Sequence, residues 1–311
     1  MARLEDPVRV VVPGALAKAL AEACTLETDG YVWAAANVAA ARAVLAGPGA
    51  RALVEAVARR LGRGGNDAPG WAVLALPARL ADEALQAAAA GVLATVGTPF
   101  YSVKEGAGRL WIGEESSAAK DLAAFGGIGE QGLHIDAPNV TDPPEYTSLL
   151  VLRPDPAGGG ASLLGDLRAA AAGLDADDRA ALSEEVWFEG RADELAGVGA
   201  PRLPFPVIEP GEPGWIRWAA KSLTDARNTR LGPLGRFAAL LEAETLAVTM
   251  GRGQLLIVDQ RRVAHGRAAL GEQQGLADGT RRLIVQAKAT RDAGAPAWRE
   301  LVARREYCDA H

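Results

Sequence analysis

Apolar positions in the first hundred residues recur at the three- and four-residue spacing of amphipathic helices. This spacing predicts helices at 15–25, 50–64 and 81–97, and the last two run into glycine, which ends helices. Between them, the short apolar run at 70–77 predicts a buried strand. The first part of the chain is therefore expected to be rich in helix.

After residue 100 the pattern changes to short apolar or alternating segments separated by turn residues, which is typical of strands. The predicted strands are 101–106, 109–115, 146–154, 185–190, 204–210, 215–223, 253–267 and 281–291, with helical inserts at about 167–184 and 233–249. Helices followed by many strands indicate an α+β fold around a β-sandwich or jelly roll. With no repeat or linker, a single domain is predicted over 1–311, helix-rich at 1–100 and β-rich at 100–295.

The composition is that of an ordinary globular protein, with 49% hydrophobic and 23% charged residues among 311. A net charge of -6 without Lys/Arg clusters argues against binding to nucleic acid or an anionic membrane. We also find no signal peptide pattern and no apolar run of the ~18 residues that a membrane span needs. Cys24 and Cys308 lie in no metal or redox motif, so reduced thiols in the cytoplasm are predicted, with a disulfide as the alternative.

Histidine is rare in this chain, which has three, and one of these is the final residue. His134 and Asp136 are separated by one isoleucine, so in an extended segment they project from the same face. His265 ends a strongly apolar segment that an antiparallel jelly roll can place beside them. Two histidines and one carboxylate form the facial triad that holds Fe(II) in non-haem oxygenases and leaves positions for a co-substrate and O₂. A chance pair or a surface ion pair is the alternative for the His-x-Asp motif alone.

Three stretches resemble, in their order and spacing, the Fe(II)- and 2-oxoglutarate-dependent dioxygenases of the TauD/TfdA and clavaminate synthase-like group. They are GLHIDAPNV at 132–140, LLIVDQRRVAHGR at 255–267 and GTRRLIVQAK at 279–288. The resemblance covers about 129–290 and implies a double-stranded β-helix core (jelly-roll, cupin-like) with N-terminal helices and helical inserts. It also implies Fe(II), 2-oxoglutarate and O₂, with the metal ligands, and hence the catalytic centre, at His134, Asp136 and His265.

The resemblance further implies an arginine that pairs with the far carboxylate of 2-oxoglutarate through two parallel hydrogen bonds. Arg282 is favoured over Arg281, because the family arginine opens a strand and only one of two neighbours can face inward. The second arginine that many members carry four residues later is replaced by Gln286, which can donate a hydrogen bond without a charge. Ser162 is the implied hydroxyl partner of the same carboxylate, or else it only satisfies a loop backbone.

The carboxylate at Asp136 argues against a halogenase, in which glycine or alanine stands at that position. We therefore predict hydroxylation, desaturation, epoxidation or cyclisation of a small, amino-acid-derived molecule of specialised metabolism, or alternatively of a small sulfonate or carboxylic acid. The rival hypotheses are a non-catalytic jelly-roll binding protein and a cupin-like metal hydrolase or isomerase, neither of which needs an arginine for a dicarboxylate. The expected substrate contacts are Gln131, Asn139, Arg267 and Arg230. Further residues expected near the site are Glu130, Lys221, Arg227 and the aromatic residues Tyr101, Trp111, Phe125 and Tyr146. Asp259 is expected to support the distal histidine.

Overall fold

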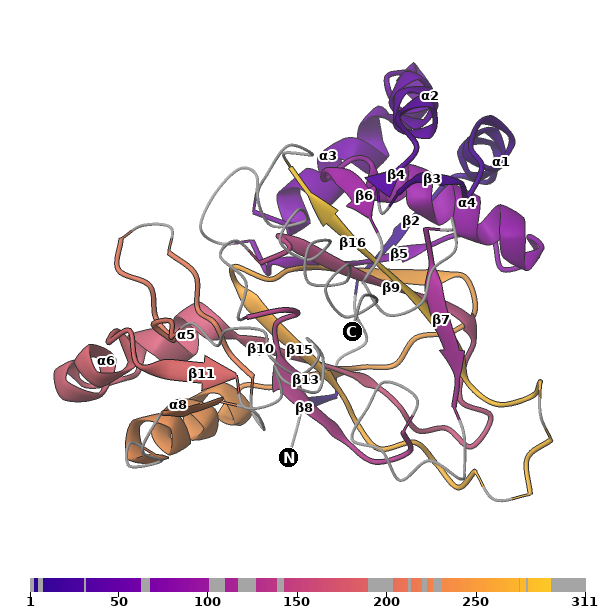
Figure 1. Ribbon diagram of the computed structural model, residues 1–311. Helices are drawn as coiled ribbons and strands as arrows, with labels where there is room; N and C mark the ends of the chain where they lie inside the picture. The colour runs from indigo at the N-terminus through magenta and orange to yellow at the C-terminus, as the bar shows by residue number, and fades with distance from the viewer. Residues whose placement is uncertain are drawn as a thin grey trace.

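The structure is a computed structural model of the whole chain. The residues that it describes are 3–4, 8–30, 32–62, 68–100, 110–116, 127–138, 143–189, 204–211, 214–219, 223–225, 231–273, 275–277 and 279–291. Within these ranges the fold is α+β, as predicted, and consists of two main sheets with helices on their outer faces (Figure 1).

The two main sheets are mostly antiparallel and are built from segments that lie far apart in the sequence. The large sheet has the order β2 (Arg9–Val11), β5 (Trp71–Ala75), β14 (Gln254–Asp259), β9 (Tyr146–Arg153), β16 (Leu283–Thr290), β6 (Thr98–Phe100), β4 (Val32–Trp33) and β3 (Thr28–Asp29), and β7 (Ile112–Glu115) also pairs with β16. The small sheet has the order β1 (Arg3–Leu4), β13 (Leu246–Val248), β10 (Ser162–Asp166), β15 (Val263–Arg267) and β8 (Gln131–His134). A separate ribbon pairs β11 (Trp187–Glu189) with β12 (Leu223–Asp225).

The outer face of the large sheet packs against the N-terminal helices, at the top of Figure 1. Alternate side chains of β16, such as Val285 and Ala287, point into this cluster. Leu20 of the first helix and Leu85 of the last are fully buried in it. The helices are α1 (Gly14–Ala23), α2 (Ala35–Leu45), the 3₁₀ turn η1 (Pro48–Ala50), α3 (Arg51–Arg60) and α4 (Asp82–Leu93).

The space between the sheets holds a second apolar cluster, to which the opposite faces of the same strands contribute. Ile284 of β16, Leu149 and Val151 of β9, and Leu164 of β10 belong to it. The outer face of the small sheet packs a third cluster against α5 (Leu167–Ala172), α6 (Ala176–Leu182) and α8 (Leu231–Ala243). Polar side chains on the inward faces of β8, β9, β15 and β16 therefore share one enclosed space.

Several predicted elements differ from those observed. The segment 253–267 is not one strand: a turn at 260–262 separates β14 from β15, which lie in different sheets. The insert predicted at 233–249 ends as a helix at residue 243, and β13 follows it. Helix α2 was not predicted, because its alanine-rich sequence offers no polar face from which a helical period could be detected.

Other predictions concern the chain as a whole. In the segments 204–210 and 215–219 the structure has isolated bridges, at Phe205, Ile208, Ile216 and Ala219, rather than the strands that were predicted; residues 220–222 lie outside the described part of the chain. Cys24 is a buried thiol, and Cys308 lies outside the described residues. None of the helices in the described ranges combines the length and apolar character of a membrane-spanning segment.

Replacing Leu20 with alanine tests the packing of the N-terminal helices on the large sheet. Leu20 is 0% exposed, so Leu20→Ala is expected to lower the free energy of unfolding by about 2–5 kcal/mol, measured by urea denaturation. The matched control is Leu231→Ala, because this leucine is 52% exposed and its loss should change stability by less than about 0.5 kcal/mol. Equal effects of the two substitutions would contradict this account of the core.

Candidate metal centre

The two internal histidines meet where β8 pairs with β15. These strands are antiparallel, and His134 lies directly opposite His265, with ring centroids 4.4 Å apart. Asp136 follows two residues after His134, and one ligand atom from each of the three residues lies within 4.8 Å of the others. The structure therefore brings together the three side chains that the sequence singles out as candidate ligands.

Hydrogen bonds to the backbone fix the segment that carries His134 and Asp136. Ile135 is buried in the outer cluster of the small sheet, and its N–H donates to the Trp218 carbonyl at 2.8 Å. The N–H of Asp136 donates to Oε1 of Gln260 at 2.6 Å, and Nε2 of Gln260 donates to the Pro144 carbonyl at 2.7 Å. Gln260 is 0% exposed and lies in the turn between β14 and β15, so this turn sets the position of the carboxylate.

The chain turns sharply immediately after Asp136. Ala137 has a φ of 52°, in the left-handed region, which costs a residue with a Cβ atom about 1–2 kcal/mol. Nη1 of Arg217 donates to the Pro138 carbonyl at 2.8 Å, and the Arg217 guanidinium is paired with Glu209. The buried Arg217 thus holds the turn in a conformation that the backbone would not adopt by itself.

Each histidine contributes a ring nitrogen to the centre. Nδ1 of His134 lies 2.9 Å from the Gly132 carbonyl, which favours a proton on Nδ1 and leaves Nε2 as the lone-pair donor. Burial lowers the pKa of His265 to about 3, helped by the nearby His134, while Asp136 opposes this shift. Nδ1 of His265 is buried without a hydrogen-bond partner in the described part of the chain.

Asp136 is ionised despite its burial. Burial alone would raise the pKa of this carboxyl, but Lys288, His265 and His134 outweigh that effect and hold the pKa well below its usual range. At neutral pH the centre therefore contains the neutral imidazole of His265 and the carboxylate of Asp136, with His134 as the third donor. This donor set suits a divalent first-row metal such as Fe(II), so the residues present fit the predicted ion.

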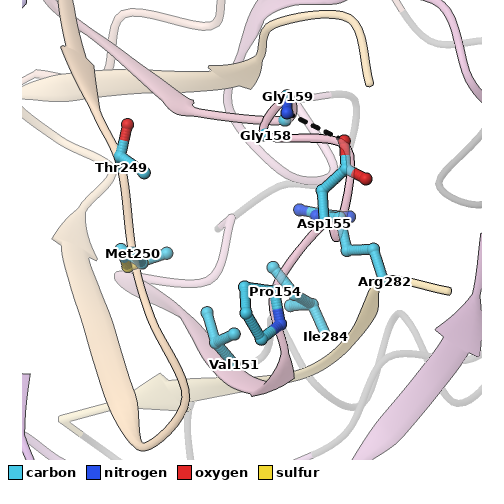
Figure 2. A pocket seen from close by; sticks show the side chains of 10 residues that line it. Val151, Pro154, Asp155, Gly158, Gly159, Thr249, Met250, Arg282 and Ile284 are labelled. Atoms are coloured by element: carbon cyan, nitrogen blue, oxygen red, sulfur yellow. Dashed lines mark hydrogen bonds between the residues drawn. The ribbon is translucent and has the colours of Figure 1, made fainter. Parts of the chain in front are cut away.

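A small cavity of about 50 Å³ lies between the sheets around Arg282. Figure 2 shows Asp155 and Arg282 on one side of it and Thr249 and Met250 on the other. The Arg282 side chain makes no hydrogen bond or ion pair with the described residues, although the residue is only 7% exposed. Burial lowers the pKa of this guanidinium to about 10, with a contribution from Arg267, while Asp155 opposes the shift. A bound anion would give this buried charge a direct partner.

The glycine-rich loop after β9 forms one wall of this cavity. Asp155 accepts hydrogen bonds from the backbone N–H groups of Gly159 at 2.9 Å and Gly271 at 2.8 Å, and from Nε2 of Gln273 at 2.9 Å. Gly160 has a φ of 72°, and a Cβ atom there would lie 3.2 Å from Nε of Arg282. Glycine at this position therefore lets the loop approach the arginine closely.

The other residues proposed to bind 2-oxoglutarate lie in different surroundings. Ser162 is buried on β10 opposite Arg267, on the inward face. Nη2 of Arg281 donates to the Leu276 carbonyl at 3.0 Å, whereas Arg282 lines the cavity. Nε2 of Gln286 donates to Oδ2 of Asp136 at 3.2 Å, so the structure places Gln286 on the candidate metal ligand.

The residues expected to contact substrate are only partly described. Gln131 is half-buried on β8, and Nη2 of Arg267 donates to the carbonyls of Gly127 at 2.6 Å and Gly129 at 2.8 Å, which fixes the approach to β8. Trp111 and Tyr146 belong to the cluster on the outer face of the large sheet, so the prediction that they lie at the site was wrong. Six of the expected contacts lie outside the described residues: Tyr101, Phe125, Asn139, Lys221, Arg227 and Arg230.

Three polar residues at the centre were missed from the sequence: Thr147, Gln260 and Lys288. Thr147 and Lys288 face inward from β9 and β16 and are paired in register. Lys288 lies six residues after Arg282, so in an extended segment the two side chains point to the same side. Lysine is also rare in this chain, so strand alternation could have identified Lys288. Gln260 carried no such signal, because it lies in a turn that was read as part of a strand.

Comparison with known proteins agrees with this geometry. The model of the taurine catabolism dioxygenase TauD, TfdA family matches residues 69–199, a range that includes His134 and Asp136. No curated protein sequence matches the chain. The match confirms the predicted resemblance to the TauD/TfdA group, whose members are Fe(II)- and 2-oxoglutarate-dependent dioxygenases that use O₂.

Solved structures of similar fold extend the likeness over most of the chain. An asparagine oxygenase in complex with Fe(II), 2S,3S-3-hydroxyasparagine and succinate has a TM-score of 0.74 and 21% identity, covering 92% of this chain and 94% of that one. The non-haem iron oxygenase OrfP in complex with Fe, succinate and (3R,4R)-dihydroxy-L-Arg has a TM-score of 0.70 and 16% identity, covering 94% and 97%. The chain thus has the fold of these oxygenases.

Removing the Gln260 amide should loosen the candidate metal centre. Gln260→Leu leaves the Asp136 N–H and the Pro144 carbonyl without their buried partners, at about 1–3 kcal/mol for each group. We expect the free energy of unfolding to fall by about 2–5 kcal/mol and Co(II) affinity to fall with it. Gln254→Leu is the control, because Gln254 accepts from the Gly251 N–H at 2.9 Å, outside the centre. Unchanged Co(II) binding in Gln260→Leu would contradict the role of Gln260 in positioning Asp136.

The metal-free protein should lose stability as the pH falls from about 6.5 toward 3, the ordinary and folded pKa values of His265. In this window the unfolded chain binds a proton that the folded chain excludes, so the free energy of unfolding falls by up to about 1.4 kcal/mol per pH unit. Urea denaturation in the presence of a chelator measures this slope. In His265→Asn the slope should be shallower by up to about 1.4 kcal/mol per pH unit, which is the contribution of one proton. An unchanged slope would assign the effect to other groups.

Proposed function

We propose that this protein is an Fe(II)- and 2-oxoglutarate-dependent oxygenase that hydroxylates a small, amino-acid-derived molecule. The observation that carries the proposal is that two unlike features lie on the inward faces of the same two sheets. One is the cluster of His134, Asp136 and His265, and the other is the cavity in which Arg282 is buried without a partner among the described residues. Together they suit a metal ion and a co-substrate that ends in a carboxylate.

In this proposal the facing sheets form a double-stranded β-helix within a single domain. His134, Asp136 and His265 would hold Fe(II). Arg282 binds the far carboxylate of 2-oxoglutarate, and Ser162 adds a hydroxyl from the neighbouring small sheet. Bound iron, 2-oxoglutarate and O₂ supply the oxidising chemistry, with release of succinate and CO₂, while the protein positions the reactants and excludes water.

The proposed substrate class rests on the fold and on the family. The asparagine oxygenase and OrfP are described with hydroxylated asparagine and arginine, and both align with this chain over more than nine-tenths of its length. A free amino acid or an amino-acid-derived compound is therefore our preferred substrate, with a role in specialised metabolism in the cytoplasm. A small sulfonate or carboxylic acid is the second candidate, because the TauD/TfdA family model matches residues 69–199.

The two rival functions explain less of the structure. A metal hydrolase or isomerase would use the two histidines and the aspartate, but it gives no role to the buried Arg282. A binding protein would not need a neutral imidazole beside an ionised carboxylate. The oxygenase proposal uses both the donor set and the buried guanidinium.

Anaerobic titration of the metal-free protein with Fe(II) and 2-oxoglutarate tests the proposal. We expect a weak visible charge-transfer band in the wild type, its loss in His265→Ala, and at least about a tenfold higher 2-oxoglutarate requirement in Arg282→Met, because a bidentate charged pair is lost. Succinate release in air, with a panel of L-amino acids and small acids, then identifies the substrate.

Arg281→Met is the matched control, since it removes the same charge from the adjacent residue. It should leave the 2-oxoglutarate requirement within about twofold of the wild-type value, given that Arg281 lies on the Leu276 carbonyl outside the cavity lining. The reverse result would move the carboxylate-binding role to Arg281. A folded wild-type protein that produces no band would favour the rival functions.

A further inference from the structure

Two polar groups of the large sheet converge on one oxygen of Asp136. Nζ of Lys288 lies 3.7 Å from Oδ2, and Nε2 of Gln286 donates to the same oxygen at 3.2 Å. The Thr147 hydroxyl accepts from Nε2 of Gln286 at 3.0 Å and so helps to orient that amide. The other oxygen, Oδ1, faces the opposite sheet and lies 3.9 Å from Nε2 of His265.

The strand register places these side chains on the same face of the large sheet. Lys288 and Thr147 are directly opposite each other in the antiparallel pair of β16 and β9, and Gln286 lies two residues before Lys288 on the same face. The Lys288 side chain is 6% exposed, and the Asp136 side chain is 12% exposed. A lysine ammonium is rarely buried unless it is paired, so its place beside a candidate metal ligand calls for a reason beyond packing.

Resting on the proposed metal site, we propose that Lys288 is a positioning residue for the carboxylate ligand. Together with Gln286 and Thr147 it holds Oδ2 of Asp136 away from the metal position, so that the carboxylate presents only Oδ1. An aspartate free to rotate can offer both oxygens to a metal ion and thereby occupy a position that the co-substrate needs. Lys288 thus keeps a coordination position open for 2-oxoglutarate.

The positive charge of Lys288 also affects how tightly the site binds a metal ion. A cation beside the ligand carboxylate repels a divalent metal ion, and this repulsion is weakly screened in a buried site. The arrangement therefore lowers metal affinity while it favours co-substrate binding. These opposite effects distinguish a positioning role from a merely structural one, which would weaken both or neither.

The test uses Co(II) as the metal probe at pH 8, with wild type, Lys288→Met and Lys288→Arg. Competition with a chelator gives the Co(II) affinity, and the visible cobalt spectrum during 2-oxoglutarate titration gives the affinity for the co-substrate. Lys288→Met is expected to bind Co(II) at least about tenfold more tightly and 2-oxoglutarate at least about tenfold more weakly. Lys288→Arg should return both values toward those of the wild type, because it restores the charge at Oδ2.

Arg291→Met is the matched control, since it also removes one positive charge at the end of β16. Arg291 contacts Tyr146 and Glu145 rather than Asp136, so both affinities should stay within about twofold of the wild type. If Lys288→Met does not fold, Thr147→Val takes its place: it removes the hydroxyl that orients the Gln286 amide toward Oδ2 of Asp136 without changing the charge. This variant should weaken 2-oxoglutarate binding by about threefold without weakening Co(II) binding.

The outcomes separate the inference from the proposed function. Equal affinities in wild type and folded Lys288→Met, or weaker binding of both ligands in the variant, would overturn the positioning role while the metal site stands. Absence of Co(II) binding by the wild-type protein would overturn the proposed function and this inference with it. Opposite changes in the two affinities, reversed by Lys288→Arg and absent in Arg291→Met, support it.

Discussion

The antiparallel pairing of β8 with β15 is the constraint on which the candidate centre depends. It places His134 opposite His265 across two neighbouring strands, although 131 positions of sequence numbering separate them. A shift of one residue in this register would turn one histidine to the outer face of the small sheet, where the third apolar cluster lies. Leu133 and Ile135, which flank His134 and are buried in that cluster, make such a shift costly.

Electrostatics at the centre follow from the way in which the two sheets face each other. The small sheet supplies His265, which burial keeps neutral, and the large sheet supplies Lys288, which keeps Asp136 ionised. Neither sheet alone would hold a carboxylate charged in an apolar interior. Arg282, which immediately precedes β16, is a second buried cation and lines the cavity. One segment of the chain thus carries the charge that stabilises a candidate metal ligand and a charge that suits a co-substrate carboxylate.

Much of this arrangement was readable from the sequence, because it depends on period-two alternation and on rare residue types. His134, Asp136 and Arg282 stand out in that way, and the structure places the two candidate ligands and the cavity arginine on inward faces. The break between β14 and β15 was not predicted, because the polar residues Gln260, Arg261 and Arg262 include no glycine or proline to mark a turn. That break moves His265 from the large sheet to the small one, and only tertiary pairing decides it.

The turn at Gln260 therefore links the fold to the chemistry more directly than any ligand does. The turn at 260–262, which separates β14 from β15, also places the buried Gln260 amide against the N–H of Asp136. The same turn therefore determines the position of His265 in the small sheet and the hydrogen bond that positions Asp136. The left-handed Ala137 and the Arg217 contact to Pro138 complete this arrangement from the other side of the carboxylate. Because each of these groups is buried and fixed by backbone contacts, the candidate ligands are preorganised by the fold before any ion binds.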